Sequence, residues 1–76
     1  MQDVRINLND LYVTRITTAG NYTYIGKALT GSATSDAVWQ VKRIDATVGT
    51  VIQWSAGTKL FDKIWDDRAA VGTVYS

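Results

Sequence analysis

The charged side chains with the most chemical potential lie near the end of the chain. Three carboxylates, Asp62, Asp66 and Asp67, stand close together beside Arg68. A pair of carboxylates can hydrolyse a glycoside, but one acid must be buried to raise its pKa, and no apolar surroundings for two facing acids are evident. A calcium ion needs more oxygen ligands than three Asp supply. We interpret the cluster as solvated charges pairing with neighbouring cations, and predict no metal and no cofactor.

Other catalytic chemistry lacks its usual residues. The chain contains no His and no Cys, which removes the commonest general base, the commonest imidazole ligand and any thiolate metal site. Ser32, Thr34 and Ser35 have no base in register, and a hydroxyl without a base is a poor nucleophile. We therefore expect no catalytic residues and a protein that is not an enzyme.

The aromatic side chains form a second candidate group, because large rings bury much area in cores and interfaces. For Trp65 the alternative is a platform that stacks against a sugar, since Asp66 and Arg68 could bind its hydroxyl groups. That alternative predicts a glycan-binding tail module. The residues predicted as core or interface anchors are Trp39, Trp54, Trp65, Tyr22, Tyr24 and Phe61.

Lys27, Lys42 and Arg43 could form a basic face that binds single-stranded nucleic acid beside aromatic rings. However, neighbouring residues of a strand point to opposite faces, so Lys42 and Arg43 would not share one. The eight Lys and Arg also nearly balance the seven acidic residues, leaving a net charge of +1. A net charge so close to zero gives no electrostatic reason to expect a polyanionic partner. A small β-barrel that binds nucleic acid is kept as the alternative function.

The composition favours strands. Every acidic residue is Asp and none is Glu, whereas Thr, Val, Ile, Tyr and Trp are abundant. Residues 36–57 predict a β-hairpin whose loop contains Gly49. Gly26, inside a predicted strand, indicates a bulge or close packing by a large ring. Further strands are predicted over residues 10–18, 22–28 and 69–75, with a turn at Gly20 and Asn21.

Two segments interrupt or extend this pattern. Leu60, Phe61, Ile64 and Trp65 have the spacing of one helical face, so we predict one short helix near residues 59–66. Residues 1–9 alternate as in an edge strand or a docking arm. The strands are apolar on more than one face, which predicts one all-β domain over residues 1–76. We expect a small antiparallel β-sandwich or barrel of five to six strands.

The size of the chain predicts a homo-oligomer. Burial of apolar surface by an 8.4 kDa chain contributes on the order of 110 kcal/mol, and ordering 76 residues costs on the order of 115 kcal/mol. These terms cancel, and the chain has no disulfide to add stability and no Pro to block a strand edge. We also expect no membrane span and no secretory signal, and hence synthesis in a cytoplasm.

Three motifs carry a resemblance to a known group. They are residues 24–28 (Tyr-Ile-Gly-Lys-Ala), residues 39–44 (Trp-Gln-Val-Lys-Arg-Ile) and residues 61–68 (Phe-Asp-Lys-Ile-Trp-Asp-Asp-Arg). Their order and spacing resemble small uncharacterised proteins of tailed bacteriophages, over roughly residues 21–76. The resemblance implies a non-enzymatic structural protein of the virion, such as a head (capsid) decoration, neck, tail or fibre module. Its partners would be copies of itself and other phage structural proteins.

Overall fold

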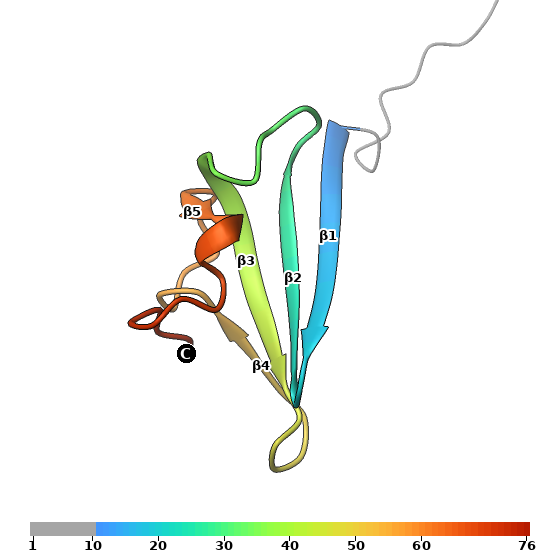
Figure 1. Ribbon diagram of the computed structural model, residues 1–76, viewed down its shortest axis with the longest axis vertical. Coiled ribbons are helices and arrows are strands. Elements are labelled where there is room, and N and C mark those ends of the chain that lie inside the picture. The colour runs from blue at the N-terminus through green and yellow to red at the C-terminus, as the bar shows by residue number, and fades with distance from the viewer. Residues whose placement is uncertain (1–10) are drawn as a thin grey trace, which may run out of the picture.

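Residues 11–76 are described by the computed structural model, and they fold as one twisted antiparallel sheet (Figure 1). Strands β1 to β4 are adjacent in chain order, and β5 pairs with the beginning of β3. The predicted all-β class is therefore confirmed, whereas the predicted arm of residues 1–9 lies outside the described residues. The strands are β1 (Tyr12–Ala19), β2 (Tyr22–Leu29), β3 (Ala37–Asp45), β4 (Val51–Trp54) and β5 (Lys63–Ile64).

The connections between the first four strands are as predicted. Gly20 has a φ of 60° in the turn between β1 and β2, a left-handed conformation that glycine adopts without steric cost. The hairpin predicted over residues 36–57 is formed by β3 and β4, whose register pairs Asp45 with Val51. In the loop that follows β3, the side chain and backbone of Thr47 hydrogen-bond to Asp45 and lower the pKa of its carboxyl.

One face of the sheet, called the covered face below, packs against the C-terminal segment, residues 55–76. Trp65 reaches this face from η1 (Trp65–Asp67), a turn of 3-10 helix, and its ring lies 5.9 Å from that of Trp39. Two backbone hydrogen bonds between Trp54 and Ser76 tie the end of the chain to β4. The buried hydrophobic residues between sheet and segment are Tyr24, Ala28, Trp39, Val41 and Trp65.

Gly26 makes this packing possible. A Cβ atom added at Gly26 would overlap the ring of Trp65 and would lie 3.2 Å from the ring of Trp39. Since atoms in a packed interior leave no room for such overlap, only glycine lets the indole lie against the strand. Of the two predicted explanations for Gly26, a bulge or the close packing of a large ring, the structure shows the second.

The second layer differs in form from the predicted sandwich or barrel. Within residues 11–76 the path β1 to β4 does not close, and the covering layer is the mostly irregular C-terminal segment rather than a second sheet. The predicted helix is present only as η1, because Leu60 and Phe61 are exposed and form no buried helical face. The prediction of a strand over residues 69–75 is wrong. In that range only Tyr75 forms a β-bridge, and its partner is Ser55.

Candidate functional site

The other face of the sheet, called the open face below, leaves large side chains in contact with solvent and meets the C-terminal segment only along one border, at residues 59–61. The register places Ile16, Ile25, Lys42 and Trp54 in one row across β1 to β4. Ile16 is 65% exposed, and Ile52 in the next row is 58% exposed. Each strand is therefore apolar on both faces, as the sequence predicted, but only the covered face is packed.

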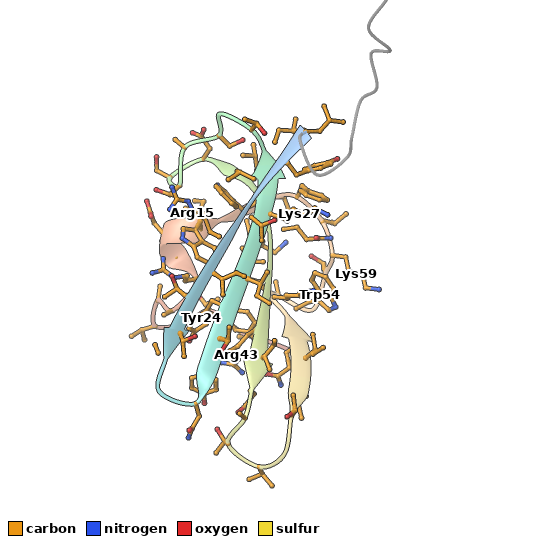
Figure 2. The ribbon with its side chains drawn as sticks, turned by 90° about the vertical axis from the view of Figure 1, so that its right-hand side faces the viewer. Arg15, Tyr24, Lys27, Arg43, Trp54 and Lys59 are labelled. Atoms are coloured by element: carbon orange, nitrogen blue, oxygen red, sulfur yellow. The ribbon has the colours of Figure 1, made fainter. Side chains whose placement is uncertain are left out.

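A loop that follows β4 forms one border of the open face. The side-chain amide of Gln40 donates a hydrogen bond of 2.9 Å to the carbonyl of Lys59, and the ring of Phe61 lies 5.7 Å from that of Tyr12. In Figure 2, Trp54 and Lys59 lie beside each other at this border. The loop therefore brings a further cation and a further ring to the open face.

Two hollows mark this face. The central hollow has a volume of about 220 Å³ and lies between β1, β2 and β3. The second, of about 370 Å³, lies where β1, the end of β2 and the loop meet. No acidic side chain lines either hollow. Thr14, Ile25, Lys27, Gln40 and Lys42 line the central hollow, and Tyr12, Leu29, Ser32, Val38 and Phe61 line the second.

The lysines of the open face lie over its aromatic rings. The Lys27 ammonium is 5.1 Å from the centroid of the Tyr12 ring. The ammonium groups of Lys42 and Lys59 are 5.5 and 5.6 Å from the Trp54 ring. Such distances allow cation–π attraction, which holds each flexible lysine near a ring. The face therefore combines positive charge with flat apolar surfaces, and it can bind a partner that offers negative charge and planar groups.

The predicted aromatic anchors divide between the two faces. Trp39, Trp65 and Tyr24 are buried on the covered face, and Tyr22 packs against them. Trp54 and Phe61 belong to the open face instead. The period-two pattern of β3 and β4 could have separated Trp39 from Trp54, but no pattern showed which face would be covered.

The predicted sugar platform at Trp65 has no accessible ring. Trp65 is 3% exposed, and the Arg68 guanidinium lies 4.6 Å from the ring centroid. Arg68 also donates a hydrogen bond to the carbonyl of Trp65 at 3.3 Å. These contacts make Arg68 part of the packing around η1.

The acidic cluster is dispersed around η1. Asp62 forms an ion pair with Lys63, whose ammonium also donates to the hydroxyl of Thr58. The backbone N–H of Asp66 donates to the carbonyl of Thr34, and Asp67 begins the turns that follow η1. Among the described residues, no group of acidic side chains is arranged to hold a metal ion.

The predicted basic face is split, as the alternation along β3 requires. Lys27 and Lys42 lie on the open face, whereas Arg43 lies on the covered face, 4.4 Å from the ring centroids of both Tyr22 and Tyr75. Its guanidinium donates to the side-chain oxygen of Gln53 at 2.6 Å. Lys59 was not predicted for the open face, because it lies in an irregular loop that has no periodic pattern.

Tyr75 is the main contact residue of the covered face that the sequence did not indicate. Its hydroxyl donates a hydrogen bond of 2.7 Å to the carbonyl of Arg68, and its ring lies 5.9 Å from that of Tyr24. Burial raises the pKa of Tyr75 to about 12. The last residues of the chain are therefore fixed to the sheet by a ring, a cation and a hydrogen bond.

Comparison with known proteins gives no match to a protein-family model, a curated protein or a solved structure. The resemblance to phage proteins therefore stays a prediction. Within residues 11–76, no helix has the length and apolar character needed to cross a membrane.

Proposed function

We propose that the chain is a non-enzymatic structural module that assembles into a homo-oligomer. The observation that supports this proposal is the outer edge of β1. Among the described residues β1 pairs only with β2, which leaves the other edge of an eight-residue strand unpaired. An unpaired edge offers its N–H and C=O groups to a further strand.

One hydrogen bond shows which backbone N–H and C=O groups of β1 point to its outer edge. The N–H of Thr30 donates to the carbonyl of Leu11 at 2.9 Å, which makes these residues a hydrogen-bonded pair of the antiparallel ladder. Hydrogen-bonded pairs recur at every second residue, so Val13, Arg15 and Thr17 also point their backbone groups toward β2. The N–H and C=O groups of the intervening residues, Tyr12, Thr14, Ile16 and Thr18, therefore point outward.

The side chains along β1 do little to prevent pairing with a second copy. The strand contains no Pro and one charged residue, Arg15, whereas protected edges carry prolines, several charges or bulges. The core is also small: five hydrophobic residues are buried, and eleven large ones are exposed among residues 11–76. Assembly would pair the edge and bury part of this surface. An antiparallel pair of β1 strands would relate two copies by a two-fold axis.

The resemblance of the motifs to phage proteins leads us to extend this proposal to a virus particle. A module made in the host cytoplasm would assemble as a head decoration, neck, tail or fibre component, where repeated copies contact one another. The test is detection of the chain in purified particles of the phage that encodes it. Its absence from the particles would contradict this part of the proposal and leave the assembly part standing.

The variant Ile16→Pro tests whether copies of the chain assemble through the edge of β1. The Ile16 N–H points away from β2, so Ile16→Pro removes an outward donor without breaking the β1–β2 ladder. We expect light scattering to show an oligomer for the unchanged chain at micromolar concentration and a folded monomer for Ile16→Pro. Ile16→Thr is the matched control, because it keeps the N–H and the β-branched shape and should remain oligomeric.

Ile16→Lys keeps the test decisive if the proline variant does not fold. It retains the backbone N–H but places a charge on the edge strand of each copy, which disfavours pairing. We expect a folded monomer or a dissociation constant raised at least tenfold. A monomer for the unchanged chain, or an oligomer that neither variant weakens, would overturn the proposal.

A further inference from the structure

We infer that the open face binds single-stranded nucleic acid, independently of the edge of β1 that carries the proposed assembly. The observation behind this inference is the separation of charge between the two sides of the sheet. Lys27, Lys42 and Lys59 gather at the open face, and none of its strand positions is acidic. In Figure 2, Lys27, Trp54 and Lys59 lie on one side of the sheet and Arg15 on the other.

The near-zero net charge of the chain conceals this separation. The ion pair of Asp62 and Lys63 lies near η1, and Asp67 lines a hollow there together with Arg68. Arg43 is held between two tyrosine rings on the covered face. Among residues 11–76 no acidic residue occupies a strand position of the open face, so the three lysines give that face a local positive charge toward solvent.

The lysines are positioned to contact a polyanion whose charges repeat. Lys27 lies opposite Gln40 in the register, and Lys42 is two residues further along β3. The backbone positions of such diagonal neighbours are about 7–8 Å apart, and both lysine side chains are long enough to reach different phosphates of one extended strand. The central hollow lies between them, with the side chain of Ile25 and the polar groups of Thr14 and Gln40 in its lining.

The aromatic rings distinguish a nucleic acid from a polyanion without bases. Tyr12 and Trp54 lie on β1 and β4 at either side of the central hollow, and Phe61 is 43% exposed beside Tyr12. Bases stack on exposed aromatic side chains in proteins that bind single strands without sequence preference. Each ammonium near a ring can turn to a phosphate when a base takes its place on the ring.

A single strand fits this face better than a duplex. The bases of a duplex are stacked on one another and cannot lie flat against Trp54 or Tyr12, whereas an unpaired strand exposes each base. A flexible acidic peptide would satisfy the lysines but has no planar groups for the rings. The combination of rings and cations therefore favours single-stranded nucleic acid over these two partners.

The test is a fluorescence anisotropy titration of the full chain with a labelled thymidine oligomer of about 12 nucleotides. We expect binding that weakens with salt. Lys27→Gln combined with Lys42→Gln should weaken it at least tenfold and reduce the slope of log affinity against log salt by about 1.4, since each phosphate contact contributes about 0.7. Arg15→Gln removes one charge from the other side of the sheet and should change affinity less than twofold.

Tryptophan fluorescence gives a second readout that does not depend on charge. Trp39 and Trp65 are buried, so quenching by a stacked base should arise at Trp54 and should disappear in Trp54→Leu. That variant should also bind roughly tenfold more weakly.

Four results would overturn the inference. They are the lack of salt-dependent binding, equal weakening by Arg15→Gln, a duplex bound as tightly as the single strand, and a poly-glutamate competitor as effective as the oligonucleotide. Assembly is measured by light scattering without nucleic acid, and binding is measured by anisotropy with variants of Lys27, Lys42 and Trp54, so failure of one proposal leaves the other unaffected.

Discussion

The two faces of the sheet have similar numbers of apolar side chains but opposite surroundings. On the covered face, Trp39 and Val41 are fully buried, and Trp65 closes over them. On the open face, Ile16 and Ile52 remain mostly exposed, and lysines lie over the rings. The comparison shows that alternation along a strand determines which residues share a face, whereas the second layer determines which face becomes a core.

The covered face is also where polar groups are used for packing. The Trp39 indole N–H donates to the carbonyl of Ala33 at 2.9 Å, and Arg43 is fixed by Gln53 and two rings. Among residues 11–76, no buried side-chain polar atom lacks a hydrogen-bond partner. Burial therefore costs these groups little, because each exchanges water for a protein partner.

The largest expected effect comes from removing the central ring of the covered face. Trp39→Ala should lower the free energy of unfolding by about 3–5 kcal/mol, because the cavity it leaves cannot collapse fully. Ile52→Thr, on the exposed row of the open face, should change it by less than about 0.5 kcal/mol. Urea denaturation followed by circular dichroism measures both values.

A comparable loss in both variants would contradict the contrast between the faces, because it would mean that the open face is buried in solution. Trp39→Phe serves as an intermediate if Trp39→Ala does not fold. It keeps a large ring but loses the hydrogen bond to Ala33, and it should cost more than Ile52→Thr and less than Trp39→Ala.

A smaller effect is expected where the covering segment meets the sheet. Gly26→Ala should destabilise the fold by about 1–3 kcal/mol, because the new methyl overlaps the ring of Trp65. Without that ring the same change in a strand would stabilise by about 0.4–1 kcal/mol, since alanine restricts the unfolded chain. The sign of the change in urea midpoint therefore tests whether Trp65 covers Gly26.

A double-variant cycle separates this contact from other effects. In the background of Trp65→Leu, the added methyl meets a smaller side chain, and the cost of Gly26→Ala should fall by more than about 1 kcal/mol. An unchanged cost would show that the methyl is not opposed by Trp65.

Much of the sheet could be predicted from the sequence because its signals are local. Gly20 and Gly49 mark turns, and β-branched residues alternate on either side of them, so the strands and the hairpin follow. The close approach at Gly26 was one of two interpretations of the sequence, because a glycine inside a strand marks either a bulge or a close approach. What could not be predicted was the identity of the partner ring, which depends on contacts distant in sequence.

The second layer was harder to predict for the same reason. Residues 55–76 have few regular elements, and their positions depend on single contacts such as Tyr75 with Arg43. Phe61 and Trp65 resembled one helical face, but they lie on opposite sides of the sheet. The lysines of the open face could be predicted only in part. Alternation places Lys27 and Lys42 on one face, whereas Lys59 reaches that face from a loop without a periodic pattern.

The smallest expected effect is an alkaline loss of stability through Tyr75. Burial raises the pKa of Tyr75 from 10.0 to about 12, so the folded state favours the neutral phenol. Its contribution to stability should be complete below about pH 10 and should be lost as the pH rises through about 12, because the unfolded chain ionises first. Urea midpoints at about pH 8 and pH 11 measure this loss, and Tyr75→Phe should show a smaller fall over the same range.

Comparing the unchanged protein with Tyr75→Phe is necessary because lysines and other tyrosines also titrate over this range. The difference between their slopes reports Tyr75 alone, and therefore reports whether the end of the chain stays on the covered face. An equal fall in both would mean that the Tyr75 ring is exposed to water and that the C-terminal segment does not hold it against Tyr24 and Arg43. The contrast between a covered and an open face would then apply to Trp65 and its neighbours but not to the part of the sheet near β4.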